Sequence, residues 1–153
     1  MRGRKVSYTQ KQEEQFTGHC RYLGLKLLAE EYRQIVDRAN ENTLGYYEFI
    51  SGIVQTEAAA RQQRHIENLV RGSRLPQPCK LIADFDFDFQ PNLNRKLIMD
   101  LASLRFIEKG ESILFLGDNG TGKSHLAQSL ALMACQGEYK THYTTCSELI
   151  GDL

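Results

Sequence analysis

The chain has 153 residues, of which 25% are charged and 41% hydrophobic, and its formal net charge is zero. These proportions are typical of a globular protein, and no apolar stretch approaches the roughly 20 residues that cross a bilayer. The basic start at Arg2, Arg4 and Lys5 is followed by no apolar segment, which argues against a secretory signal and for a cytoplasmic protein without membrane contact.

The N-terminal half is predicted to be helical after a polar beginning. Residues 1–20 show no apolar period, which predicts a disordered lead-in. Apolar residues then recur at helical spacing, and turn residues at 40–43 interrupt the pattern once. We expect residues 21–75 to form a small all-α domain that binds DNA or a protein partner. Its helical stretches run from Tyr22 to Ala39, from Tyr46 to Val54, and from Ala58 to Gly72.

The last of these stretches carries basic residues at spacings that place them on one helical face. A stripe of arginines suits contacts with the phosphates of double-stranded DNA, without preference for base sequence. The alternative is a solvated face of an amphipathic helix, with Ile66, Leu69 and Val70 buried opposite. The candidate DNA contacts are Arg61, Arg64, Arg71 and, just past the helix end, Arg74.

Residues 76–92 read as a linker between two domains. Pro76 and Pro78 favour an extended chain, and acidic and aromatic residues then alternate. A period of two lays Phe85, Phe87 and Phe89 on one side of an extended segment. These rings could pack on the amphipathic helix predicted from Leu93 to Leu104, or could border a pocket for a nucleotide base.

A phosphate-binding loop follows. Residues 117–124 read Gly-Asp-Asn-Gly-Thr-Gly-Lys-Ser, which matches the pattern G-x-x-x-x-G-K-[ST]. The apolar run 112–116 before the loop predicts a buried strand, and apolar residues after it recur at helical spacing, from Leu126 to Ala134. Strand, glycine-rich turn and helix in this order are the context that the motif requires.

The residue types of this loop suit a nucleoside triphosphate with Mg²⁺. Glycines let the backbone N–H groups converge, and the start of the following helix adds a positive field for phosphate oxygens. Lys123 supplies a charge for the β- and γ-phosphates, and the Ser124 hydroxyl is placed to ligate Mg²⁺. The predicted ATP-binding residues are Gly117, Asp118, Asn119, Gly120, Thr121, Gly122, Lys123, Ser124 and His125.

The C-terminal part, residues 93–153, is predicted as the beginning of a nucleotide-binding domain. Residues 140–145 are rich in β-branched and aromatic side chains and suggest a second strand. The fold class is therefore an α/β P-loop NTPase with an incomplete parallel sheet, preceded by the small all-α domain. No apolar strand ending in Asp or Glu lies downstream of Ser124, and no arginine follows it, so hydrolysis of ATP by this chain alone is not expected.

The cysteines give no sign of a metal site or a disulfide framework. They are scattered, without a C-x-x-C pair and without a histidine at ligand spacing, so reduced thiols are expected. The four are Cys20, Cys79, Cys135 and Cys146.

Several separated segments together resemble one known family. Glu57 to Arg64, Asp84 to Phe87, Leu101 to Leu104 and Gly117 to Ala127 stand in an order and spacing similar to those of the IstB-like ATP-binding proteins. These are AAA+ helpers of insertion-sequence transposition, related to DnaC-type helicase loaders. The resemblance implies a helical N-terminal domain, an ATPase core, assembly into oligomers on DNA, and a transposase as partner. The family's second acidic motif, sensor residues and arginine finger would lie beyond Leu153.

The resemblance leaves alternatives open. A helicase loader would share the fold and serve a replicative helicase in place of a transposase. A non-catalytic fragment that binds DNA or a protein partner would keep the nucleotide site only as a remnant. In either case, this chain looks like the N-terminal part of a longer protein.

Overall fold

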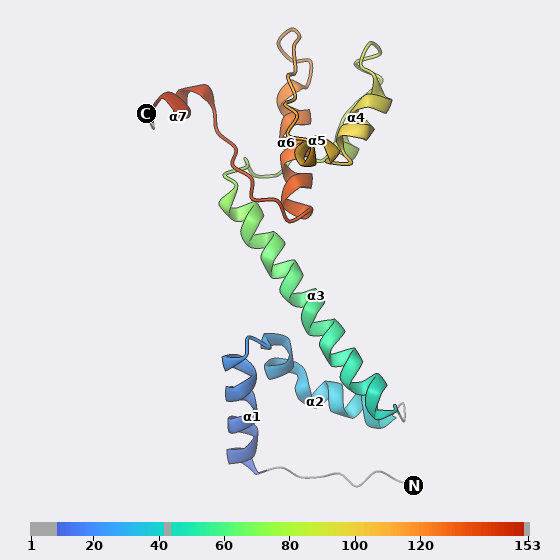
Figure 1. Ribbon diagram of the computed structural model, residues 1–153, viewed down its shortest axis with the longest axis vertical. Coiled ribbons are helices and arrows are strands. Elements are labelled where there is room, and N and C mark those ends of the chain that lie inside the picture. Colours follow the sequence, from blue (N-terminus) through green and yellow to red (C-terminus); the bar gives the residue numbers. More distant parts are fainter. Residues whose placement is uncertain (1–8, 42–43, 152–153) are drawn as a thin grey trace. The chain divides into compact units, whose positions relative to one another are not determined.

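The computed structural model describes residues 9–41 and 44–151 (Figure 1). The chain divides into two compact units, Met1–Arg64 and His65–Leu153. The boundary lies inside one long helix, α3 (Tyr46–Gly72), and not at residue 76 where the composition predicted a linker. The reason is that Leu69, Val70 and Leu75 pack into the core of the second unit.

The first unit contains α1 (Gln10–Tyr22), α2 (Lys26–Glu41) and the beginning of α3, and α1 packs against α2. The predicted disordered lead-in is wrong for the residues that α1 covers, while residues 1–8 lie outside the described residues. Gly24, with φ of 77°, separates α1 from α2 and places the start of the second helix at Lys26.

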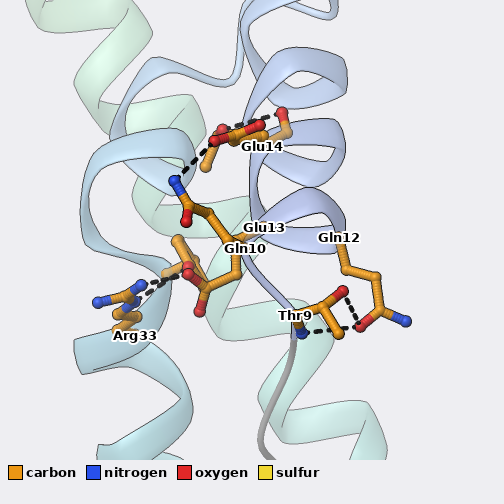
Figure 2. A network of polar contacts seen from close by, with 8 residues as sticks. Thr9, Gln10, Gln12, Glu13, Glu14 and Arg33 are labelled. Carbon is orange, nitrogen blue, oxygen red and sulfur yellow. Dashed lines mark hydrogen bonds and ion pairs between the residues drawn. The ribbon is translucent and has the colours of Figure 1, made fainter.

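Local and tertiary contacts explain why such a polar segment is helical (Figure 2). Thr9 forms a capping box with Gln12, whose side chain accepts the Thr9 N–H at 2.9 Å. Glu13 forms an ion pair with Arg33 of α2. Phe16 packs edge-on against Tyr32 with ring centroids 5.2 Å apart. The ion pair and the ring contact cross from α1 to α2, so no pattern within α1 alone could reveal them.

The charged side chain of Glu57 lies in the interior of the first unit. Glu57 is 5% exposed, and its carboxylate accepts the backbone N–H of Leu28 at 3.0 Å and the guanidinium of Arg64 at 3.1 Å. Leu28 belongs to the first turn of α2, whose N–H groups have no partner within the helix. Glu57 therefore caps α2 from α3 and fixes the two helices to each other.

The second and third predicted helical stretches are one helix. α3 runs without interruption from Tyr46 to Gly72, because residues between the two stretches include good helix formers and no proline. By contrast, the single helix predicted from Leu93 to Leu104 is divided. It becomes α4 (Arg95–Leu101) and α5 (Arg105–Glu108), and the break falls at Leu104, which has a left-handed φ of 63°.

The second unit is built around α6 (Lys123–Gln136), the helix that follows the glycine-rich loop (Figure 1). One hydrophobic cluster joins Leu75 to Leu132 and Cys135 on α6. The other joins Phe85 and Ile98 to Leu126 near the start of α6. The short elements η1 (Ile82–Asp84) and α7 (Cys146–Gly151) complete this unit.

The structure shows no strand within residues 9–41 and 44–151. The segments 112–116 and 140–145, predicted as strands, are neither helical nor paired in a ladder. In the first segment Phe115 packs on the cluster around Phe85, whereas Leu114 and Leu116 are 79% and 83% exposed. A strand exists only when a neighbouring segment completes its hydrogen bonds, so the parallel sheet stays a prediction. No helix in the described part of the chain is long and apolar enough to cross a membrane.

Candidate nucleotide-binding site

The glycine-rich loop, residues 117–122, lies between the segment 112–116 and the first turn of α6. Gly120 and Gly122 have φ of 79° and 86°, a region in which a side chain is strained. Gly122 is the N-cap residue of α6, and the first bond inside the helix runs from Leu126 N–H to its carbonyl at 3.0 Å. The N–H groups before Leu126 are therefore left for another acceptor, as an anion site at a helix start requires.

The ammonium group of Lys123 folds back over the loop. Its Nζ donates to the carbonyl oxygens of Gly117 at 2.9 Å and Asp118 at 2.5 Å, and Thr121 Oγ1 lies 3.4 Å away. The Thr121 hydroxyl donates to the Asp118 carbonyl at 2.8 Å. These bonds hold a positive charge on the loop, where negative phosphate oxygens would compete for it.

Ser124 is exposed at the second position of α6, which leaves its hydroxyl accessible. A single hydroxyl is a fitting Mg²⁺ ligand only beside phosphate oxygens and water, because Mg²⁺ prefers six oxygen ligands. The described residues contain no group of three or more acidic, histidine or cysteine side chains that could hold a metal without a nucleotide. The donor set thus fits Mg²⁺ bound together with a nucleotide.

His125, predicted as part of the same motif, has its side chain in a different environment. Its Nε2 lies 2.7 Å from the carbonyl oxygen of Leu81, which makes this nitrogen the protonated donor. Its ring also meets the ring of Phe85 edge-on at 5.4 Å. The side chain of His125 thus contacts residues before the loop, and only its backbone N–H is available to a phosphate.

The segment of alternating acidic and aromatic residues is folded and not extended. Phe85 is 8% exposed and lies in the core, whereas Phe89 is 70% exposed, so the predicted common side of the three phenylalanines is wrong. The carboxylate of Asp86 accepts the N–H groups of Asp88 and Phe89 at 3.0 and 3.1 Å and forces a turn. Phe87 carries the guanidinium of Arg95 over its ring at 5.0 Å.

A cavity of about 270 Å³ adjoins the loop. The residues that line it include Gly117, Asp118 and Lys123 of the loop region, and also Gln90 and Asn92. Sequence patterns did not single out these two amides. The only available signal was their position just after the aromatic segment, which the turn at Asp86 brings to the cavity.

The predicted DNA-contacting arginines differ in their surroundings. Arg61 is exposed on α3, while Arg64 is held by the buried carboxylate of Glu57. Arg71, near the end of α3, and Arg74, with φ of 59°, are exposed residues of the second unit. The structure therefore gives Arg64 a role inside the first unit.

The cysteines form no disulfide. All four are free; Cys20 and Cys135 are buried, Cys79 is half-buried and Cys146 is exposed. Burial is the main reason why the pKa of Cys20 is raised above its ordinary value, and the charge of Glu57 raises it further.

A glycine-rich loop closed by a lysine at the start of a helix is the mark of the P-loop nucleotide-binding class. A match of the sequence to a known protein family supports the assignment of this chain to the P-loop class. Residues 18–153 match the family model for the IstB-like ATP binding protein, and the chain belongs to this family. Membership in this family supports the fold class of a P-loop ATPase, although the described residues contain no strand.

Curated relatives are proteins of bacterial insertion sequences. One, named as an ATP-binding protein of insertion sequence IS232 from Bacillus thuringiensis subsp. berliner, is 36% identical over 140 residues, 92% of this chain and 56% of the relative. Another, of IS5376 from Geobacillus stearothermophilus, is 36% identical over 141 residues, with the same two shares. A third, of IS21 from Pseudomonas aeruginosa, is 34% identical over 131 residues, 86% of this chain and 49% of the relative. The chain thus spans about half the length of these relatives.

Proposed function

We propose that this chain binds ATP at residues 117–125 and acts as an ATP-binding helper in the transposition of an insertion sequence. The observation that carries ATP binding is the arrangement around Lys123, whose ammonium lies on the loop carbonyls at the start of α6. The names of the relatives support the helper role, because each is named as an ATP-binding protein of an insertion sequence. They favour this role over that of a replicative helicase loader.

The proposed binding mode uses each part of the loop. Phosphate oxygens would replace the carbonyls of Gly117 and Asp118 as partners of the Lys123 ammonium and would accept the free N–H groups at the start of α6. Mg²⁺ would join Ser124 to the phosphates and contribute charge neutralisation there. The cavity lined by Gln90 and Asn92 offers space beside the phosphates for the rest of the nucleotide.

We further propose that the residues present here bind ATP without hydrolysing it. Hydrolysis requires an acidic residue near the phosphates to orient water. Glu138 follows the C-terminal end of α6, about 20 Å from its first turn by helix geometry. The carboxylate of Glu148 is occupied by Thr145, whose N–H it accepts at 2.8 Å. Of the acidic residues within 125–151, Glu138 thus lies far from the loop, and Glu148 is engaged at the start of α7.

Double-stranded DNA and a transposase are the proposed partners, together with assembly into a homo-oligomer. The exposed arginines Arg61, Arg71 and Arg74 support contacts with DNA phosphates. Arg64 does not support them, because its guanidinium is engaged by Glu57.

The test of ATP binding is a titration of the chain with a fluorescent ATP analogue, with and without Mg²⁺. Replacement of Lys123 by alanine should weaken binding at least about tenfold, since a charge-assisted hydrogen bond is lost. Lys140→Ala is the matched control, because this substitution removes the same charge from a residue that lines a different cavity. Mg²⁺ should tighten binding to the wild type more than to Ser124→Ala.

Two outcomes would contradict the proposed ATP binding, and a third would contradict only the proposed lack of hydrolysis. Equal affinity of wild type and Lys123→Ala would show that the analogue binds elsewhere. Absence of saturable binding in a chain that melts cooperatively would show that the loop is not a working site. Release of phosphate at a rate lost in Lys123→Ala would contradict the proposed lack of hydrolysis while leaving ATP binding intact.

A further inference from the structure

The phosphate-binding loop is in contact with a segment that precedes it by more than 30 positions in the sequence. A Cβ built on Gly122 would lie 2.5 Å from Cε2 and 3.0 Å from Cζ of Phe85, so the ring of Phe85 rests directly on this glycine. Phe85 itself is 8% exposed and shares a hydrophobic cluster with Leu126, which is 2% exposed. The ring is therefore held from the side of the core as well.

His125 adds a second contact between the same two segments. Its Nε2–H donates to the carbonyl of Leu81 at 2.7 Å, and its ring packs edge-on against Phe85 at 5.4 Å. Residues 122, 125 and 126 are spaced by three and four, which places them on one face at the start of α6. The segment 81–85 thus lies along the face of α6 that adjoins the loop.

We propose that Phe85 and His125 are positioning residues, which brace Gly122 and the first turn of α6 so that the phosphate-binding loop keeps one shape before a ligand arrives. This inference deepens the proposed ATP-binding function and rests on it. Neither side chain needs to touch the nucleotide, because both act on the backbone that presents the N–H groups.

The physical reason for a brace is the freedom of glycine. A glycine-rich loop samples many backbone conformations, and a ligand that requires one of them must offset the lost entropy. The ring of Phe85 occupies the space beside Gly122 and limits the conformations that the loop end can adopt. The bond from His125 to Leu81 prevents the segment 81–85 from moving away from α6. Phosphate would then bind to a loop that already has the conformation required for binding.

The proposal is tested first in the free chain, by hydrogen exchange of the amides in residues 117–122. His125→Ala should speed exchange in this loop several-fold, whereas exchange in the second half of α6 should stay the same. His65→Ala is the matched control, an exposed histidine on α3 in the same unit. Phe85→Leu should also speed exchange in this loop. Its control is Phe89→Leu, because Phe89 is exposed.

The second readout separates positioning from a merely structural role. Affinity is measured for the fluorescent ATP analogue and for inorganic triphosphate. His125→Ala should weaken both by the same factor, about fivefold, because the brace acts through the phosphate seat and one hydrogen bond is lost. His125→Gln keeps a donor and His125→Phe keeps a ring, so each should recover part of the affinity. The melting temperature of each variant identifies loss of the fold as a separate effect.

The outcomes separate this inference from the function on which it rests. Unchanged loop exchange in both His125→Ala and Phe85→Leu overturns the brace, even when the wild type binds ATP. Faster exchange with unchanged affinity for triphosphate overturns the positioning role. A wild type that binds neither ligand overturns the proposed ATP binding, and the exchange data then still decide whether residues 81–85 order the loop.

Discussion

The guanidinium of Arg64 donates to the buried carboxylate of Glu57 at 3.1 Å, and this pair removes one arginine from the basic face of α3. The side chain of Arg64 is 34% exposed and that of Glu57 is 7% exposed, so the pair is sheltered from solvent on one side. The same carboxylate caps α2 through Leu28. Arg64 thus neutralises a charge that the helix packing requires, and the arginine stripe is not a uniform surface.

Removal of Glu57 should destabilise the first unit. In Glu57→Ala the N–H of Leu28 and the guanidinium of Arg64 lose their acceptor, which costs about 2 kcal/mol for partly buried polar groups. Glu57→Gln should cost less, since its amide oxygen still accepts one bond. Urea unfolding followed by circular dichroism measures the difference, and Glu30→Ala, an exposed glutamate on α2 of the same unit, is the control. Equal unfolding midpoints for Glu57→Ala and Glu30→Ala would contradict this role.

Arg61 and Arg64 should respond differently in a DNA-binding assay. Arg61→Ala should weaken binding to any duplex and reduce the salt dependence of log K by about one charge, because one phosphate contact is lost. Arg64→Ala should chiefly lower the melting temperature, because the charge of Glu57 is left without its partner. Fluorescence anisotropy with a labelled duplex at several salt concentrations measures the first effect. An unchanged salt slope in Arg61→Ala would exclude this residue from DNA contact.

Gly122→Ala should disrupt the loop. The added Cβ would meet the Phe85 ring at 2.5 Å, and φ of 86° is itself costly for alanine, by about 1–2 kcal/mol. Gly72→Ala is the matched control within the same unit, because a Cβ there would meet nothing within 4 Å. We expect lower stability and loss of nucleotide binding only in Gly122→Ala. Thermal melting and the ATP titration measure both effects, and wild-type behaviour of this variant would disprove the close packing.

The thiols should differ in their rates of alkylation. Cys146 is exposed and should react with iodoacetamide first, whereas Cys20 should be among the slowest. Burial raises the pKa of Cys20, which lowers the thiolate fraction at mildly alkaline pH and shields the sulfur as well. Mass spectrometry of peptides after timed labelling measures the order. In Glu57→Ala, which loosens the helix packing, labelling of Cys20 should become faster; a rate for Cys20 equal to that of Cys146 in the wild type would contradict the burial.

The glycine-rich loop and the helix after it were predictable, because they depend on residues that are neighbours in the sequence. The spacing of Gly117, Gly122 and Lys123 identified the loop, and the apolar period after it identified α6. The contact of Phe85 with Gly122 was not predictable, since no local pattern relates residues so far apart. Gln90 and Asn92 were missed for the same reason: the turn at Asp86 brings them to the cavity.

Helix α1 shows the same limit in the first unit. Its composition predicted disorder, yet the ion pair of Glu13 with Arg33 and the packing of Phe16 on Tyr32 connect it to α2. The predicted strand at residues 112–116 stays a prediction for a related reason. Their apolar run predicted a strand, but a strand needs a paired neighbour, and the described residues supply none.

The sequence by itself determined the glycine-rich loop motif, the helix that follows it and the family, because these depend on residue types at short, fixed spacing. Only the tertiary structure decided that Arg64 forms an ion pair with Glu57, that Phe85 packs on Gly122, and that a polar N-terminal segment is helical. The reason is physical: burial and ion pairing arise between segments that fold against each other, and the energy of such contacts outweighs local preference.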